Sequence, residues 1–229
     1  EIGYKRELPK NIELKYVRYE INFLEKLFSI FSIFNGLFWN EILEIRKNYK
    51  MKITFGILKT LMISIANSKR LMRNYLSIFK GHDLSKTIFY SYWSFDTAIA
   101  LSMISNINPS FKAVSRIHGA DVFFETSNYD YLPLRHFITE NLKYIFSISQ
   151  SGVDYCYKKW KVQSKIHLSK LGVKYQIPIF DSSDENIIVS CSNIIPLKRL
   201  SLIIESLSLI KTLKIYWFHF GDGPLKEAV

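Results

Sequence analysis

Polar residues and glycines follow several short apolar runs of the sequence, and their types are those that bind anions. One such place is "SRIHGADVFFE" (115–125), where a histidine, a glycine and an aspartate end an apolar run. The others are Ser149–Ser151, Ser192–Asn193 and Gly221–Gly223. Two adjacent cations, Lys198 and Arg199, stand at a predicted helix start. Cations, glycine backbone and the free N–H groups of helix starts together favour a phosphate-bearing ligand.

Each of these residues also has an ordinary structural explanation. His118 fits a turn in which its ring is satisfied, and Ser149 fits a helix cap. The run Gly221–Pro224 fits a tight turn with proline at the first helical position. Lys198 and Arg199 fit a solvated surface. Only their placement at equivalent points of one repeating pattern favours the ligand site.

The pattern that positions them begins near residue 86. From there on, short apolar runs alternate with segments whose apolar residues have helical spacing. The predicted strands are 86–93, 113–119, 144–149, 165–173, 186–192 and 214–221. The predicted helices are 95–106, 133–142, 150–160, 198–210 and one that begins at 224. Such alternation predicts βαβ units and a parallel sheet covered on both faces. In sheets of this class, ligands bind beyond the carboxyl ends of the strands, where the polar residues fall.

The stretch "PIFDSSDEN" (178–186) is the one polar, proline-containing break in this alternation. We interpret it as a linker, which predicts an N-terminal domain of residues 1–180 and a second α/β domain that starts within 181–229. The alternative is a loop inside one domain.

Composition limits the class of protein. Nearly half of the 229 residues are apolar, which predicts a packed core rather than disorder. Cys156 and Cys191 have no CxxC or zinc-type spacing, so we expect a reducing compartment and buried thiols. No signal peptide is visible. The formal net charge of +11 predicts an acidic partner, and no nucleic-acid-binding signature accompanies it.

The positive charge is concentrated between residues 45 and 80, where nine cations occur without an acid. Lys52, Lys59, Arg73 and Lys80 are spaced by multiples of seven, and the apolar residues opposite them are Ile57, Leu58, Leu61, Met62 and Ile65. This predicts a basic amphipathic helix, which suits an anionic membrane surface. We therefore expect a cytoplasmic protein, or one peripheral on the inner face of the plasma membrane.

The apolar run 27–39 lies just before this basic region. It is too short to span a bilayer, for which about 20 apolar residues are needed. Two interpretations stay open: ordinary buried or half-buried helices, or a face that rests on a membrane.

Five stretches in this order resemble landmarks of the retaining glycosyltransferases of family 4. They are "SRIHGADV", "FSISQSGVDYCYKKW", "LSKLGV", "VSCSNIIPLKRLSLIIESL" and "HFGDGPLKEAV". The resemblance runs from about Tyr90 to the end of the sequence. It implies a GT-B-like α/β fold, in which a Rossmann-type acceptor-side domain and a second, donor-binding Rossmann-type domain face a cleft. The chain would hold only the start of the second domain.

The resemblance also assigns residue roles in the first domain. His118 and Gly119 match a histidine–glycine pair next to the donor sugar, and His118 is the expected catalytic residue. It would orient the sugar and stabilise positive character at the anomeric centre. Asp121 is a possible support of that turn.

In the second domain, Lys198 matches a lysine that contacts the donor diphosphate. Asn193 occupies the position of the family's usual arginine, and Arg199 is expected to supply that charge. Gly221 and Gly223 match glycines of a loop near the nucleotide.

The expected reaction moves a sugar from a nucleotide-diphosphate sugar to a glycan or a lipid-linked acceptor, as in cell-surface polysaccharide synthesis. Neither a cofactor nor a metal is expected, because the sequence has no Asp-x-Asp motif and cations can neutralise the leaving diphosphate. The family's first strand and its paired-glutamate motif are not found. We therefore expect an incomplete enzyme, inactive or nearly so by itself.

Two other classes of protein remain as alternatives. One is a non-catalytic membrane- or partner-binding scaffold with a degenerate nucleotide site. The other is an NAD-dependent oxidoreductase, which the sequence disfavours because G-x-G-x-x-G is missing.

Overall fold

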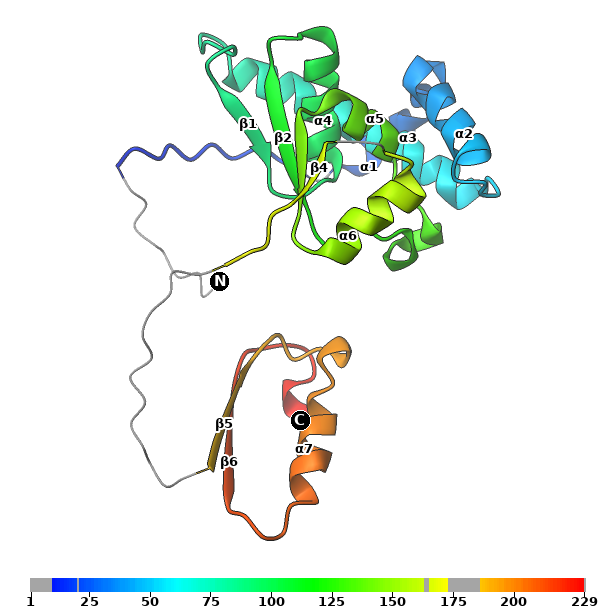
Figure 1. Cartoon of the computed structure of the whole chain (residues 1–229). Coiled ribbons are helices and arrows are strands. Elements are labelled where there is room, and N and C mark those ends of the chain that lie inside the picture. The colour runs from blue at the N-terminus through cyan, green and yellow to red at the C-terminus, as the bar shows by residue number, and fades with distance from the viewer. Residues whose placement is uncertain (1–9, 20, 163–164, 173–185, 229) are drawn as a thin grey trace. The chain divides into compact units, whose positions relative to one another are not determined.

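The computed structural model describes residues 10–19, 21–162, 165–172 and 186–228 of the chain, which divides into two compact units, Glu1–Gly172 and Val173–Val229 (Figure 1). The predicted linker and the predicted boundary between 180 and 181 lie outside the described residues, apart from position 186.

The first unit is built on a four-stranded parallel sheet whose strand order follows the chain, β1-β2-β3-β4. The strands are β1 (Ile88–Ser91), β2 (Lys112–Ile117), β3 (Tyr144–Ser147) and β4 (Ile166–Leu168). The helices between them are α4 (Asp96–Ile107), α5 (Arg135–Asn141) and α6 (Gln150–Tyr155), which a π-helical turn (Cys156–Trp160) extends. The predicted alternation of strands and helices is confirmed, although β4 is much shorter than expected. The unit is α/β and Rossmann-like.

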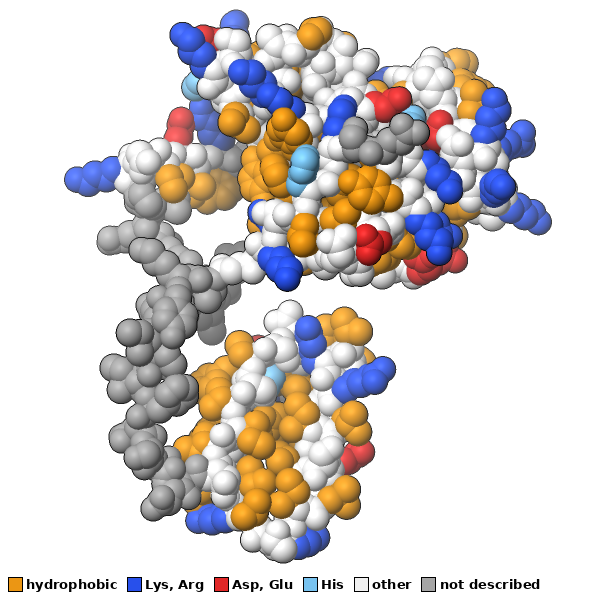
Figure 2. Space-filling model, viewed as in Figure 1, with side chains coloured by type: hydrophobic (Ala, Val, Ile, Leu, Met, Phe, Trp, Pro, Cys, Tyr) orange, Lys and Arg blue, Asp and Glu red, His pale blue; other side chains and the backbone are white. Residues whose placement is uncertain are grey.

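The described helices between the strands cover one face of this sheet. Parallel crossovers are right-handed, so a sheet whose strands follow the chain order has all its crossover helices on the same side. The side chains facing them, such as Ala113 and Ile145, are fully buried. On the opposite face Ile88 is 71% exposed, Tyr90 49% and Tyr144 41%. Figure 2 shows hydrophobic side chains over the strands there. Among the described residues the sheet is thus covered on one face, not on both as expected.

Four helical segments precede the sheet. They are α1 (Phe23–Phe28), the 3₁₀ segment η1 (Ser29–Phe34), α2 (Gly36–Lys47) and α3 (Phe55–Ile78). The long helix α3 packs against α4, where Ser64 and Asn67 of α3 donate hydrogen bonds of 2.5 and 2.7 Å to the Asp96 carboxylate. None of the helices in the described part of the chain is long and apolar enough to cross a membrane.

The helix α3 confirms the predicted amphipathic helix but is shorter than the basic pattern. Ile57 and Leu61 are buried against the core, and Lys59 and Arg73 are exposed. The helix starts after Thr54, whose hydroxyl caps it, and ends at Ile78. Lys52 and Lys80 therefore lie outside the helix, so only two of the four expected cations share its face.

The second unit is a single βαβ motif. Its strands β5 (Asn186–Cys191) and β6 (Ile215–Phe220) pair in parallel, and α7 (Leu200–Ser208) connects them after a 3₁₀ turn, η5 (Pro196–Lys198). The predicted strands and helix are confirmed with slightly shorter bounds. The helix expected from residue 224 is instead a 3₁₀ turn, η6 (Lys226–Ala228).

The two cysteines differ in environment. Cys156 is buried in the first unit, as predicted, but Cys191 is exposed at the end of β5. A two-stranded sheet with one described helix leaves much of its surface open, which explains why the prediction of a buried thiol is wrong for Cys191.

Candidate functional site

The loops after β1 and β2 are tied together by one carboxylate. Asp121 accepts a hydrogen bond from the backbone N–H of His118 at 2.5 Å and another from the backbone N–H of Ser94 at 2.7 Å. Asp121 is fully buried, and burial raises the pKa of its carboxyl group, an effect that the two N–H donors oppose. Asp121 thus fixes the turn that carries His118 at the carboxyl end of the sheet.

A buried arginine, the first residue of α5, holds the same turn by hydrogen bonds. Arg135 donates from Nη1 to the carbonyl oxygens of Ser94 (2.5 Å) and Asp121 (3.1 Å). Its guanidinium lies 5.5 Å from the ring centroid of Trp160. Burial lowers the pKa of Arg135, and the neighbouring Asp121 opposes that shift. Hydrogen bonds therefore connect the loops after β1 and β2 and the start of α5 in one polar network.

The imidazole of His118 lies beneath two aromatic rings. Its centroid is 4.1 Å from that of Trp93 and 4.8 Å from that of Tyr92, and the residue is 7% exposed. Neither ring nitrogen has a hydrogen-bond partner among the described residues. Burial lowers the pKa of His118, so the ring is neutral at pH 7. A neutral imidazole offers one donor and one acceptor, and buried polar atoms rarely stay unpaired, so this ring is suited to a polar ligand group.

Gly119 is exposed next to this histidine. A Cβ atom built there meets nothing within 4 Å, so the described protein itself does not require glycine at this position. The open space in front of Gly119 leaves room for a ligand close to the backbone.

A groove of about 1140 Å³ is lined by the edge strand β1 and by residues of the 13–19 segment, and it reaches the turn that carries His118. Its lining is mainly aromatic and aliphatic and includes Phe79, Tyr90, Tyr92, Trp93 and Ala120. The last of these lies two residues after His118 in the sequence. Such a surface suits the apolar or ring-stacking part of a ligand whose polar part reaches the turn.

In the second unit, the two predicted glycines allow the loops after β5 and β6 to touch. A Cβ on Gly221 would lie 1.9 Å from the carbonyl oxygen of Ser192, and one on Gly223 would lie 2.4 Å from that of Ile194. The backbone N–H of Ile194 donates to the carbonyl oxygen of Asp222 at 2.9 Å. Close packing of two loops therefore accounts for both glycines without a ligand.

The two predicted cations lie at the junction of η5 and α7. Lys198 is the last residue of η5, and Arg199 is the N-cap of α7 with a left-handed φ of 51°. Both residues are exposed, as is Asn193 in the loop after β5. The first N–H groups of α7 and two cations on adjacent residues suit an anion such as a phosphate.

The sequence matches no model of a known protein family, and no curated protein matches it either.

The structure gathers the predicted residues into two groups. His118, Gly119 and Asp121 share one turn of the first unit, and the five others lie around the ends of β5 and β6 and the start of α7. No group of three or more His, Cys, Asp or Glu residues suited to a metal occurs in the part of the chain that the structure describes.

Sequence reasoning missed Tyr92, Trp93 and Arg135. The sequence "SYWSF" (91–95) at the end of β1 carried a signal, because ligand pockets lie beyond strand ends in such sheets and are lined mainly by hydrophobic and aromatic side chains. Nothing in the local sequence distinguished Arg135 from a surface arginine.

Proposed function

We propose that this chain is part of a retaining GT-B glycosyltransferase that moves a sugar from a nucleotide-diphosphate sugar to a glycan or lipid-linked acceptor. The observation that best supports it is the neutral, buried imidazole of His118, unpartnered among the described residues, at the carboxyl end of a parallel sheet. That is where Rossmann-like sheets bind ligands, and His118 and Gly119 belong to one of the motifs that carry the family resemblance.

In this proposal, the second unit holds the donor diphosphate. The negative charge of a diphosphate grows as it leaves the sugar, and fixed cations stabilise that charge more in the transition state than in the ground state. Lys198 and Arg199 supply the cations, and the first N–H groups of α7 supply oriented donors. A divalent metal is not needed for this step.

His118 acts on the sugar rather than on the phosphate. Because its ring is neutral, it adds no positive charge next to an anomeric carbon that is becoming positive. One ring nitrogen is free to hold a sugar hydroxyl or to donate near the reacting centre. The carboxylate of Asp121 fixes the backbone of the same turn, so the position of His118 at the strand end is set before the donor binds.

The aromatic groove beside the turn suits the acceptor. Tyr90, Tyr92 and Trp93 present ring surfaces along it. Such rings stack on sugars or contact the isoprenoid part of a lipid-linked acceptor, and either arrangement brings an acceptor hydroxyl toward His118.

Donor binding tests the proposal with the chain as it is. We expect UDP-, GDP- or ADP-glucose to raise the unfolding temperature or to give saturation-transfer NMR signals, and Lys198→Ala with Arg199→Ala to weaken binding at least tenfold. A charge-assisted hydrogen bond contributes about 1.5–3 kcal/mol, which is why a tenfold loss is the lower bound. Lys211→Ala, an exposed lysine of the same unit, is the matched control.

Three outcomes would contradict the proposal. The first is an absence of binding by any nucleotide sugar at millimolar concentration. The second is equal binding by the double variant and the Lys211→Ala control. The third is binding of NAD in place of nucleotide sugars, which would favour the oxidoreductase alternative.

A further inference from the structure

The segment α1–η1 turns small polar side chains toward the protein and large apolar side chains toward the outside, which is the opposite of an ordinary surface helix. Ser29 and Ser32 are only 4% and 5% exposed. Phe28, Phe31 and Phe34 are 63%, 60% and 81% exposed. A surface helix normally turns its apolar stripe to the core and its polar stripe to water.

The two serines are satisfied where they lie. The hydroxyl of Ser32 donates to the backbone oxygen of Met62 on α3 at 3.1 Å, and that of Ser29 donates to the backbone oxygen of Lys26 at 2.6 Å. The small serines thus allow close packing of η1 on α3, and the larger side chains point outward.

The outward side chains form one continuous surface. Phe28 and Phe31 have ring centroids 6.2 Å apart, and those of Phe31 and Phe34 are 6.4 Å apart, both pairs stacked. The neighbouring side chains that are also more than half exposed are Phe23, Leu24, Leu27 and Ile30. We call these seven side chains the phenylalanine face.

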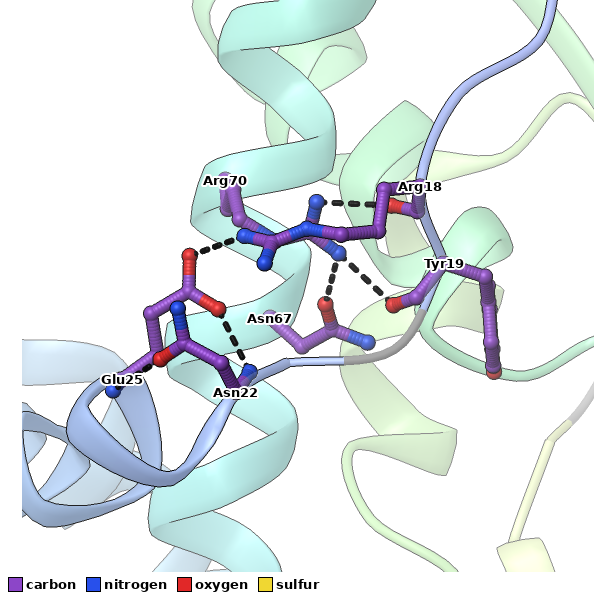
Figure 3. Close-up of polar contacts among 6 residues, drawn as sticks. All are labelled: Arg18, Tyr19, Asn22, Glu25, Asn67 and Arg70. Carbon is purple, nitrogen blue, oxygen red and sulfur yellow. Dashed lines mark hydrogen bonds and ion pairs between the residues drawn. The ribbon is translucent and has the colours of Figure 1, made fainter.

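A network of polar contacts holds this face in place (Figure 3). Arg70 of α3 donates to the backbone oxygens of Arg18 and Tyr19 at 2.6 Å each. Arg18 pairs with Glu25 in the first turn of α1, and Asn22 and Glu25 form a reciprocal capping box. These contacts connect the start of α1, which carries part of the phenylalanine face, to α3.

Three exposed cations belong to the elements that carry or support this face. At 3.6 residues per turn, Lys59, Met62, Arg70 and Arg73 fall within an arc of about 80° on α3. Met62 and Arg70 contact η1 and the segment leading into α1, so the exposed Lys59 and Arg73 lie on the same side of α3 as the phenylalanine face. Lys26 is exposed within α1 itself.

We propose that the phenylalanine face lies in the interface of an anionic lipid bilayer, with Lys26, Lys59 and Arg73 next to the headgroups. Aromatic side chains prefer the boundary between headgroups and acyl chains, and flanking cations add attraction to anionic lipids. A second copy of the chain is disfavoured as the occupant, because it would bring another net charge of +11 to a cation-flanked surface. The proposal does not depend on glycosyl transfer.

Vesicle co-sedimentation of the full chain tests the proposal. We expect binding to phosphatidylcholine vesicles that contain phosphatidylglycerol, and roughly a tenfold or greater loss for the triple variant Phe28→Ser/Phe31→Ser/Phe34→Ser. The matched control is Ile107→Ser/Leu171→Ser, which removes two exposed apolar side chains of the same unit that belong neither to the phenylalanine face nor to the aromatic groove, and is expected to bind like the wild type. Lys59→Gln/Arg73→Gln is expected to lose roughly fivefold for each cation on the anionic vesicles.

A second measurement needs no variant of the face itself. Trp39 is 57% exposed, and its Nε1 donates to the backbone oxygen of Ile33 in η1 at 2.8 Å, so it reports on the position of this segment. We expect brominated lipids to quench its fluorescence, and Trp39→Phe to remove most of the quenching.

Several results would overturn the proposal. They are a wild-type chain that does not bind anionic vesicles, a triple variant that binds as tightly as the wild type, or a control variant at Ile107 and Leu171 that loses as much binding as the triple variant. A concentration-dependent dimer that the triple variant dissociates, without vesicle binding, would assign the face to self-association instead.

Discussion

The carboxyl group of Glu41 makes the stability of the first unit depend on pH. Glu41 lies in α2, is 2% exposed, and accepts hydrogen bonds of 2.9 Å at Oε1 from the hydroxyl of Tyr131 and from the backbone N–H of Leu134. Leu134 has a left-handed φ of 61° and precedes α5. Burial raises the pKa of Glu41 from 4.5 to about 7, although both donors oppose that shift.

The raised pKa determines the direction and the size of the effect. Between pH 4.5 and about 7, the folded chain keeps a proton on Glu41 that the unfolded chain releases, so the free energy of unfolding falls as the pH rises. Each pKa unit corresponds to about 1.4 kcal/mol, so the loss is about 3 kcal/mol and is complete above pH 7. The contribution is fully present below pH 4.5.

The substitution Glu41→Gln tests this reasoning. Glutamine keeps an oxygen that can accept both hydrogen bonds but does not ionise, so we expect a pH dependence of stability that is about 3 kcal/mol smaller than in the wild type. Urea unfolding followed by far-UV circular dichroism at pH 4.5 and pH 8 measures the difference. The buried Asp96 is present in both proteins, so its contribution to the pH dependence of stability cancels in the comparison.

The control for the charge change is Glu44→Gln, which removes a carboxylate from the same helix. If Glu41→Gln and the wild type lose equal stability between pH 4.5 and pH 8, the explanation by burial of this carboxyl group is refuted.

Two further substitutions test the structural roles given to the strand-end loops. Asp121→Asn replaces an acceptor of two backbone N–H groups by an amide that can accept at only one atom, so we expect a loss of about 1–3 kcal/mol in unfolding free energy, measured by urea titration; unchanged stability would contradict its role in holding the turn. Gly221→Ala places a Cβ 1.9 Å from the Ser192 carbonyl oxygen and is expected to broaden or shift the NMR signals of the second unit, whereas Gly36→Ala, with nothing within 4 Å, is expected to leave the spectrum and the stability nearly unchanged.

Much of the α/β core was predictable from the sequence, because strands and helices after residue 86 differ in length and periodicity. Each strand is a short apolar run and each helix has apolar spacing of three or four, so their order follows from local pattern alone. Cover on both faces was not predictable in this way. It depends on which strands are neighbours, and the chain-ordered sheet places its crossover helices on one side.

The reversed amphipathicity of η1 shows another limit of sequence reasoning. Ser29 and Ser32 form a polar stripe in the sequence, but the stripe does not reveal which side of the segment faces the protein. Only the contact with α3 decides that, because Ser32 finds its hydrogen-bond partner there.

The candidate site was predictable in part. The sequence indicated His118 because a histidine, a glycine and an aspartate end one strand. It did not indicate that Tyr92 and Trp93 cover the imidazole, or that Arg135 supports the turn. Those contacts join side chains from separate loops, and sequence spacing alone does not show which loops meet.

The strand order of the first unit also affects how it can form during synthesis. Paired residues of successive strands are only 24, 30 and 21 positions apart along the chain. Each new strand therefore needs only the strand just made, and pairing can proceed step by step as the ribosome releases the chain. In every intermediate on that route, the strand synthesised last lies at the edge of the sheet and has one unpaired side. Nascent chains of this protein should thus be most prone to wrong intermolecular pairing while β2 and β3 are the last strands to have emerged.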